Sequence, residues 1–225
     1  MRVFLTGASG FVGSAVLREL LDSGHQVLGL ARSEASARSV AEAGAEVHLG
    51  SLDDLDSLRR GASAADGVIH TAFIHDFSDL AASCRADIRA IETIGDALAG
   101  SGRPFVVTSG MCFDAPGRPG TEADPGDPAA GWRLRVPSEV ATLALAARGV
   151  RASVLRLPPS VHGRQLGVPV LGVSTEGAAD HFGWFVHFFG SDKPTSSSRT
   201  RERLGWRPIQ PGLIADVDRP SYFTT

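Results

Sequence analysis

The sequence predicts an α/β fold, a doubly wound parallel sheet followed by a small, truncated C-terminal segment. Three observations lead to this prediction. Short apolar segments alternate with segments of helical periodicity through the first two thirds of the chain, and a glycine-rich turn joins the first strand to the first helix. The 225 residues are 43% hydrophobic, enough for one such domain with a small appendage. Such alternation indicates parallel strands joined by right-handed helical crossovers.

The bounds of the elements follow from apolar spacing and from the glycines that end the helices. The predicted strands are Arg2–Thr6, Gln26–Ala31, Glu46–Leu49, Gly67–Thr71, Pro104–Thr108 and Ala152–Leu157. The predicted helices are Phe11–Ser23, Glu34–Ala43, Asp53–Arg60, Phe77–Ala99 and Pro137–Ala147. Asp53 is the expected N-cap of the third helix, since a carboxylate there accepts from free backbone N–H groups.

The last third of the chain gives a weaker pattern. Residues 115–131 are rich in Pro, Gly and Asp and predict a loop. Residues 178–189 carry many aromatic side chains and predict a short helix that packs on the main domain, and Thr200–Leu204 predicts another that ends at Gly205.

Charge and composition exclude several classes of function. The net charge is -3 and no basic block is present, which argues against a nucleic-acid partner. No apolar run approaches the roughly 20 residues of a membrane span. The first residues enter a strand directly and lack the pattern of a signal peptide, so we expect a cytoplasmic protein. Cys84 and Cys112 have no metal-ligand spacing, so we expect two lone thiols and no metal site.

The glycine-rich turn over residues 6–13 has the composition of a phosphate-binding loop. Gly7 permits a tight turn, Gly10 lets the backbone approach a pyrophosphate, and Gly13 lets the helix pack close to the strand. The alternative is a tight turn without a ligand, but a strand before it and a helix after it form the context for dinucleotide binding. The predicted cofactor-binding residues here are Thr6, Gly7, Ser9, Gly10, Phe11, Val12 and Gly13.

The G-x-x-G-x-x-G spacing of this turn, with four later segments in the same order, resembles the extended and atypical, epimerase-like branches of the short-chain dehydrogenase/reductase superfamily. The four segments are Val68–Ala72, Val106–Gly110, Val154–Gly163 and Arg203–Pro208. The resemblance implies a Rossmann domain that binds NAD(P) over residues 1–163 and a small substrate-side segment over residues 164–225. It further implies a small-molecule substrate and a homodimer formed through the predicted helices Phe77–Ala99 and Pro137–Ala147.

The end of the second strand predicts which nicotinamide cofactor binds. An acidic residue there would bind the ribose 2′-OH of NAD, whereas an arginine accommodates the 2′-phosphate of NADP. Arg32 and Ser33 stand at this point, so we expect NADP(H) in preference to NAD(H), the alternative being that Arg32 is a solvated surface residue. The resemblance places further residues beside the cofactor: Ser51, Leu52, Thr71, Ala72, Phe73, Thr108, Pro158 and Val161.

The catalytic pattern of the superfamily is incomplete in this chain. The resemblance implies a Tyr and, four residues later, a Lys on one helix, but Arg135 and Glu139 stand at those positions. An arginine stays protonated at neutral pH and cannot give up a proton. One interpretation is that these two residues form a helix-surface ion pair at i, i+4. The other is that Arg135 acts in the substrate site.

Ser109 stands at the position of the superfamily's catalytic serine, and His75 follows the fourth strand where a substrate would enter. Histidine can replace Tyr as a proton donor because its pKa lies near neutrality. His70, on the strand itself, fits a packed core residue better. We therefore predict Ser109, His75 and Arg135 as catalytic residues. A serine hydrolase is not expected, since no G-x-S-x-G turn is present.

These observations favour an NADP(H)-dependent oxidoreductase that acts on a small carbonyl or alcohol substrate without the Tyr–Lys pair. Two alternatives remain: a non-catalytic NADP(H)-binding redox sensor or regulator, and an epimerase or dehydratase of a nucleotide-linked substrate. The chain also lacks, near Arg164, an internal block that the extended proteins carry in their substrate lobe.

Overall fold

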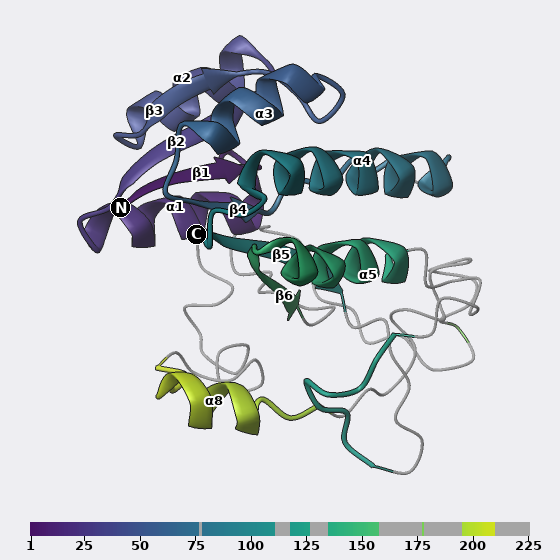
Figure 1. Cartoon of the computed structure of the whole chain (residues 1–225). Coiled ribbons are helices and arrows are strands. Elements are labelled where there is room, and N and C mark those ends of the chain that lie inside the picture. The colour runs from purple at the N-terminus through teal and green to yellow at the C-terminus, as the bar shows by residue number, and fades with distance from the viewer. Residues whose placement is uncertain (77, 111–117, 127–134, 158–176, 178–194, 210–225) are drawn as a thin grey trace. The chain divides into compact units, whose positions relative to one another are not determined.

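The computed structural model describes residues 1–76, 78–110, 118–126, 135–157, 177 and 195–209. The chain divides into two compact units. The first comprises residues 1–112 and 127–156, and the second comprises residues 113–126 and 157–225. The first unit carries the sheet and the helices that cover it (Figure 1). The division between residues 163 and 164 made from the sequence stays a prediction.

A six-stranded sheet forms the centre of the first unit, with strand order β3-β2-β1-β4-β5-β6. The strands are β1 Arg2–Thr6, β2 Gln26–Ala31, β3 Glu46–Leu49, β4 Gly67–His70, β5 Pro104–Gly110 and β6 Arg151–Leu157. β1 pairs in parallel with β2 and with β4, β2 with β3, and β4 with β5. The order reverses between β1 and β4, which confirms the doubly wound sheet that the sequence predicts.

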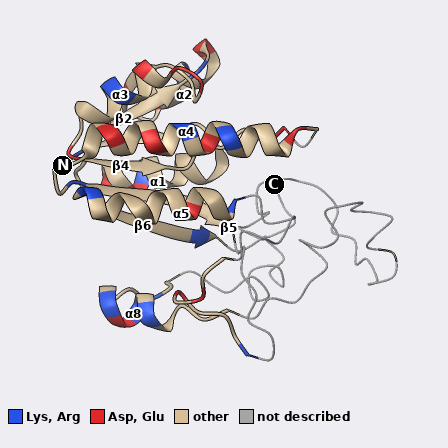
Figure 2. Ribbon diagram, turned by 45° about the vertical axis from the view of Figure 1, so that its right-hand side comes forward, with Lys and Arg blue, Asp and Glu red and all other residues tan. Residues whose placement is uncertain are grey.

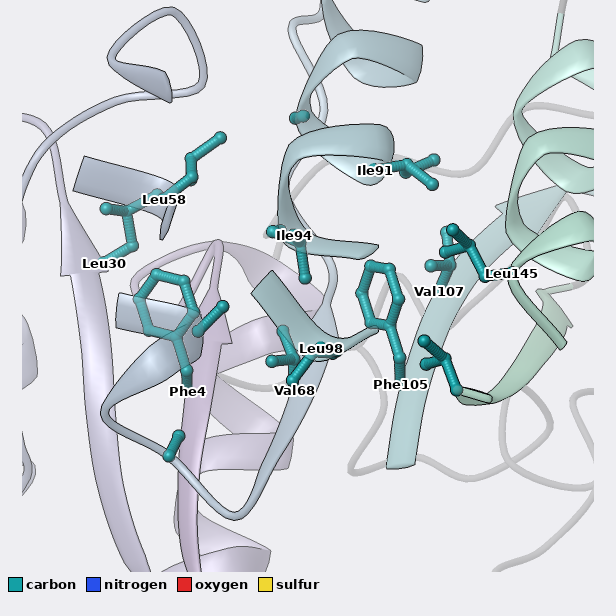
Figure 3. Close-up of a cluster of buried hydrophobic side chains, with 14 of the residues drawn as sticks. Phe4, Leu30, Leu58, Val68, Ile91, Ile94, Leu98, Phe105, Val107 and Leu145 are labelled. Atoms are coloured by element: carbon teal, nitrogen blue, oxygen red, sulfur yellow. The ribbon is translucent and has the colours of Figure 1, made fainter. Parts of the chain in front are cut away.

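Helices cover both faces of this sheet. They are α1 Phe11–Asp22, α2 Glu34–Glu42, α3 Leu55–Ser63, α4 Leu80–Leu98 and α5 Val136–Ala144, the last continued by the 3₁₀ turn η1 Leu145–Arg148. Phe4 and Leu5 are neighbours on β1 and therefore point to opposite faces. Phe4 joins side chains of α3 and α4 in one core cluster, drawn in Figure 3, while Leu5 joins side chains of α1 and α2 in another.

The structure corrects the predicted ends of several elements. The N-cap of α3 is Asp54, whose carboxylate accepts from the Ser57 N–H at 2.9 Å, and Asp53 lies one residue outside. The fourth helix begins at Leu80, after the cap Asp79, because the Asp79 carboxylate accepts the Ala82 N–H at 2.8 Å. β5 continues two residues past Thr108, so Ser109 belongs to the strand.

The second unit is described only in part. Helix α8, Ser198–Leu204, ends at Gly205, whose φ of 63° is the left-handed conformation that glycine adopts most readily. Glu122 accepts both the backbone N–H and the hydroxyl of Thr200, at 2.8 and 2.7 Å, and these bonds lower the pKa of Glu122. The predicted helix over residues 178–189 lies outside the described residues, as do residues 115–117 and 127–131 of the predicted loop.

Acidic and basic residues are interspersed along α4 (Figure 2). Arg85, Arg89, Glu92 and Asp96 are its exposed charged residues, so both signs occur on one helix face. In the parts of the chain that the structure describes, no helix is both long and apolar enough to cross a membrane.

Candidate functional site

The candidate site lies where the carboxyl ends of β1 and β4 meet. The chain moves from β1 toward β2 and β3 on one side, and from β4 toward β5 and β6 on the other. The loops that follow these two strands therefore diverge, and an open α/β sheet binds its ligands in the crevice between them. Residues 6–13 follow β1, and residues 71–76 follow β4.

Gly7 and Gly13 are required by the packing of the loop itself. Gly7 has a φ of +71°, and a Cβ there would lie 2.7 Å from the backbone nitrogen of Ala72. A Cβ on Gly13 would lie 1.9 Å from the carbonyl oxygen of Gly7. Neither contact can be relieved by a side-chain rotation, because both involve backbone atoms. Glycine at these two positions therefore allows α1 and the residues that follow β4 to pack closely against the loop.

Gly10 differs from both of these glycines. Its φ of −82° is ordinary, and an added Cβ would meet only the Gly7 carbonyl oxygen, at 3.2 Å. The fold therefore makes only a mild demand for glycine at this position. A pyrophosphate lying against the backbone would account for the missing side chain, since a Cβ would occupy its place.

The start of α1 leaves its backbone donors available. Gly10 is the N-cap, no side chain caps the helix, and its first turn carries no acidic residue. The first N–H groups of a helix have no partner within the helix and favour anions. Ser9 and Phe11 are exposed here, while Val12 is half-buried. The seven predicted residues of the loop thus adjoin one helix N-terminus.

Arg32 is exposed at the end of β2 and makes no hydrogen bond or ion pair with any residue that the structure describes. The adjacent Ser33 is the N-cap of α2: its hydroxyl accepts the Ser36 N–H at 3.2 Å. The sequence indicated Ser33 as a donor to a phosphate, and the structure adds this capping role. The guanidinium of Arg32 stays available to a ligand.

Ser51 and Leu52 are both engaged within the protein. The Ser51 hydroxyl accepts the N–H groups of Asp53 and Asp54, each at 3.3 Å, and so shapes the turn before α3. The Leu52 side chain belongs to the core cluster around Phe4. Any contact with an adenine would therefore come from the backbone of this turn, and their cofactor role stays a prediction.

Threonines join the ends of β1, β4 and β5. Thr71 donates its hydroxyl to the Thr6 carbonyl oxygen at 2.7 Å, and Thr108 donates to the His70 carbonyl oxygen at 3.0 Å. The N–H of Ala72 donates to the Thr6 hydroxyl at 3.3 Å. These bonds align the three strand ends beside the loop.

Beneath this surface lies a buried polar chain. The Thr6 hydroxyl lies 2.8 Å from Nδ1 of His70, and Nε2 of His70 lies 3.2 Å from Oδ1 of Asp87 on α4. The same Asp87 oxygen lies 3.0 Å from Nη1 of Arg135. The Thr6, His70 and Asp87 side chains have no solvent exposure. His70 is therefore the core residue that the sequence suggested, although a fully hydrogen-bonded one.

Asp87 is ionised within this chain. Burial raises the pKa of a carboxyl group, but the hydrogen bond from His70 and the charge of Arg135 outweigh that effect, and the Ser138 hydroxyl assists at a geometry short of a full hydrogen bond. The pKa of Asp87 is consequently lowered below its ordinary value of 3.8.

Arg135 is the N-cap residue of α5, and three contacts hold its guanidinium. Besides Asp87, its Nη2 donates to the carbonyl oxygen of Thr108 at 2.7 Å, and its central carbon lies 4.3 Å from the ring centroid of Phe73. Phe73 thereby makes a cation–π contact. The Arg135 side chain is 17% exposed, so part of it remains open to a ligand.

The predicted i, i+4 ion pair between Arg135 and Glu139 does not form. Glu139 instead pairs with Arg156 on β6, whose Nη2 lies 2.7 Å from a Glu139 oxygen, and the Glu139 side chain is 4% exposed. Each of the two α5 residues thus has an oppositely charged partner on another element. The reason is burial, because both side chains point into the sheet-facing side of α5 instead of toward solvent.

Ser109 and His75 lie at the ends of neighbouring strands. Ser109 is 6% exposed, and its hydroxyl has no hydrogen-bond partner among the described residues. His75 is exposed and packs edge-on against Phe73, with ring centroids 5.4 Å apart. Because buried hydroxyls normally have a partner, Ser109 is a candidate for binding a substrate oxygen.

Sequence reasoning missed Asp87 and Arg156 as site residues. Asp87 lies among apolar positions of α4, between Cys84 and Ile91, and a charged residue on a buried helix face was the available signal. Arg156 lies on a strand, where no spacing rule points to its partner. Pro158 and Val161 lie outside the described residues. The described residues hold no cluster of metal-ligating side chains, and Cys84 is buried on α4.

Comparison with known proteins decides the family. Residues 3–133, more than half of the chain, match the profile described as the NAD dependent epimerase/dehydratase family. The chain belongs to the NAD dependent epimerase/dehydratase family. It is thus an NAD(P)-binding member of the short-chain dehydrogenase/reductase superfamily, as the resemblance implied, and this superfamily consists largely of enzymes.

Two yeast proteins match this family member over nearly its whole length. An uncharacterised protein of Schizosaccharomyces pombe is 36% identical over 298 positions, covering 99% of this chain and all of that protein. An uncharacterised protein of Saccharomyces cerevisiae is 32% identical, covering 96% and 98% of the two chains. The 298 aligned positions exceed the 225 residues of this chain, so the fission yeast protein carries residues without a counterpart here. This supports the missing internal block.

Solved structures share the fold at low identity. WbmG of Bordetella bronchiseptica, in complex with NAD and UDP, is 17% identical with a TM-score of 0.66, covering 94% of this chain and 91% of WbmG. A short-chain dehydrogenase/reductase superfamily protein of Agrobacterium tumefaciens with bound NAD is 23% identical, with a TM-score of 0.56. That match covers 69% of this chain, which spans only about half (48%) of the Agrobacterium protein. These likenesses confirm the Rossmann fold.

Proposed function

We propose that this protein is an NADP(H)-dependent oxidoreductase that acts on a small carbonyl or alcohol substrate without the usual Tyr–Lys pair. The observation that carries the proposal is the loop at Gly10. The protein leaves a place there that a Cβ would fill, at the N-terminus of α1 and beside the ends of β1 and β4. A dinucleotide pyrophosphate fits this combination of a bare backbone and free helix N–H groups.

The residues that would hold the cofactor follow from this placement. The loop from Thr6 to Gly13 would hold the pyrophosphate, Arg32 the 2′-phosphate, and Thr71, Ala72 and Phe73 would adjoin the nicotinamide half. When bound, the nicotinamide supplies or accepts a hydride, and the protein provides orientation and electrostatics. Arg32 supports NADP(H), because an arginine makes charge-assisted, bidentate bonds to a phosphate.

Ser109 and Arg135 would receive the substrate oxygen. Ser109 offers a hydroxyl without a partner, and Arg135 offers a guanidinium held in place by Asp87 and Thr108. Arg135 stabilises negative charge but cannot supply a proton. General acid catalysis contributes typically ~10²–10⁴-fold, so turnover should be slow unless the exposed His75, Ser109 or water supplies the proton.

Cofactor preference tests the first part of this proposal. Calorimetry should give tighter binding of NADPH than of NADH by about tenfold or more, corresponding to about 1.4 kcal/mol. Arg32→Asp should remove or invert this preference, and Arg38→Asp, a change of the same charge on the exposed side of α2, should leave it intact. Equal affinity of the wild type for both cofactors would overturn the NADP(H) assignment.

A carbonyl panel tests the second part. NADPH oxidation is followed for one accepted substrate in the wild type and in Ser109→Ala, His75→Ala, Arg135→Met and Tyr222→Phe. The first three should lose activity and Tyr222→Phe should not. Loss of activity in Tyr222→Phe alone would show that a distant tyrosine supplies the proton.

The redox-sensor alternative is favoured by one observation. Arg135 and Glu139, at the positions of the superfamily's Tyr and Lys, are both engaged in ion pairs. NADPH binding without turnover of any carbonyl in the panel would support a non-catalytic sensor.

A further inference from the structure

A line of buried polar side chains connects the nucleotide loop with the start of α5. It runs from the Thr6 hydroxyl through His70 and Asp87 to Arg135, with successive separations of 2.8, 3.2 and 3.0 Å. The first three side chains are fully buried, and they belong to β1, β4 and α4. Neither His70 nor Asp87 is assigned a contact with the substrate, so the presence of these two buried groups calls for an explanation of its own.

The hydrogen-bond pattern determines where the protons of this line lie. A carboxylate only accepts hydrogen bonds, so Nε2 of His70 donates to Asp87. In a neutral imidazole Nδ1 is then an acceptor, and it receives the hydrogen of the Thr6 hydroxyl, whose oxygen also accepts the Ala72 N–H. Asp87 ends the line as a carboxylate facing the Arg135 guanidinium. Each group in the line is a donor or an acceptor toward the next, so a movement of the Thr6 hydroxyl changes the hydrogen bonding of His70 and, through it, the electrostatic field at Asp87.

We propose that Asp87 is a positioning residue for Arg135, and that His70 and Thr6 tie the position of Arg135 to occupation of the nucleotide loop. The proposal rests on the proposed function, because it takes residues 6–13 as the dinucleotide site. Thr6 directly precedes Gly7, so a phosphate that displaces the loop displaces its hydroxyl. The position of the Arg135 guanidinium is therefore expected to change when a dinucleotide occupies the loop.

Burial makes this line an effective connection. In a low-dielectric interior, hydrogen bonds polarise one another and an unpaired member is costly, so the partners move together. Asp87 has no solvent to compensate for a displaced Arg135. A second buried pair, Glu139 with Arg156, starts from the same helix but has no recorded bond to Thr6, His70 or Asp87. Arg156, also 17% exposed, is therefore a matched internal control.

The experiment follows the side-chain Nε–H signals of Arg135 and Arg156 by NMR in arginine-labelled full-length protein. Arg135→Lys and Arg156→Lys assign the two signals. The probe is 2′-phospho-ADP-ribose, which carries the pyrophosphate but no nicotinamide ring that would touch Arg135 directly. In the wild type, saturation with this probe should move the Arg135 signal by more than its linewidth and leave the Arg156 signal in place.

Two variants interrupt the line at different bonds. Thr6→Val removes one hydroxyl at constant shape, and His70→Leu removes both bonds of the imidazole while Asp87 keeps Arg135 as its counter-ion. Thr6 belongs to the proposed nucleotide loop, so the affinity of each variant for the probe is measured first and each variant is saturated at its own concentration. At saturation, the Arg135 signal should no longer respond in either variant. Asp87→Asn should shift and broaden the Arg135 signal in the free protein, without effect on Arg156. If either of the other variants fails to fold, the Thr6→Val result alone decides whether the loop is connected to Arg135.

The outcomes separate the two levels of inference. Failure of the wild type to bind 2′-phospho-ADP-ribose would overturn the proposed function, while the Asp87→Asn spectrum would still test the positioning role. Binding with no movement of the Arg135 signal, or an undiminished response in Thr6→Val, would overturn the connection to the loop. An Arg135 signal unchanged by Asp87→Asn would overturn the positioning role.

Discussion

Among the residues of the loop, Gly10 has the least to do with the fold. A Cβ added at Gly13 would lie 1.9 Å from a backbone oxygen, whereas a Cβ added at Gly10 would lie 3.2 Å from its nearest neighbour. We expect Gly10→Ala to change the free energy of unfolding by no more than about 0.5 kcal/mol. Dinucleotide affinity should nevertheless fall at least tenfold, because the methyl group occupies the place of the pyrophosphate. Urea unfolding and calorimetry measure the two effects.

Gly13→Ala is the matched comparison for this prediction. Its methyl group overlaps backbone atoms, so the variant should lose about 1–3 kcal/mol or more of stability, with or without a ligand. Full dinucleotide affinity in a well-folded Gly10→Ala protein would remove the main support for the loop as the cofactor site.

Asp87 gives stability a defined dependence on pH. Its pKa is lower in the folded protein than the ordinary value of 3.8, so its contribution is present above the unfolded pKa. That contribution is lost as the pH falls through the folded pKa. Asp87→Asn leaves Arg135 without its buried counter-ion and should cost about 3–5 kcal/mol near neutral pH. The difference from the wild type should narrow toward pH about 3, as urea unfolding across this range measures.

Asp22→Asn serves as the control, because Asp22 is exposed at the end of α1. Its unfolding curve should follow the wild type at each pH. A constant difference between Asp87→Asn and the wild type at every pH would mean that Asp87 titrates alike in the folded and unfolded chains.

At the scale of elements, two buried ion pairs fasten the start of α5 to its neighbours. Arg135 joins it to α4, and Glu139 joins it to β6. Glu139→Ala should destabilise the protein by about 3–5 kcal/mol, because it removes the buried carboxylate that pairs with Arg156, whose side chain is only 17% exposed. Asp56→Ala, which breaks the exposed pair with Arg59, should cost about 0–1 kcal/mol.

Thermal and urea unfolding of the two variants compare these costs directly. Similar losses in both would mean that water reaches the Glu139–Arg156 pair as freely as it reaches the surface pair. Asp56 also lies in the first turn of α3, where replacement by alanine changes both the charge and the helix propensity. Asp56→Asn is therefore measured beside Asp56→Ala to separate these two effects.

At the scale of the whole molecule, we expect a homodimer formed through α4 and α5. The exposed side of α5 carries Val140 and Leu143, which are 56% and 54% exposed, and apolar side chains of this kind pack well against a second copy. Light scattering at micromolar concentration should give twice the mass of 23.5 kDa. Val140→Glu with Leu143→Glu should return the mass to that of one chain, and a monomeric wild type would refute the dimer.

Much of the architecture could be predicted from the sequence. The strand bounds of β1, β2 and β3 agree with the prediction, because apolar runs between glycines leave little freedom there. The glycine loop was also recognisable, since its three glycines stand at fixed spacing between a predicted strand and a predicted helix. Errors arose where two candidates were adjacent, as with Asp53 and Asp54, because either aspartate can cap a helix and only the backbone path selects one.

The sequence by itself determined the order of strands and helices, the nucleotide loop and the loss of the Tyr–Lys pair, because each depends on residue type and on spacing of a few positions. Only the tertiary structure decided the partners of the charged residues. Arg135 and Glu139 are spaced for a pair with each other, yet Arg135 pairs with Asp87 and Glu139 with Arg156, forty-eight and seventeen positions away. The physical reason is burial: a charge removed from water takes the partner that the packed interior supplies, and sequence spacing does not encode that neighbour.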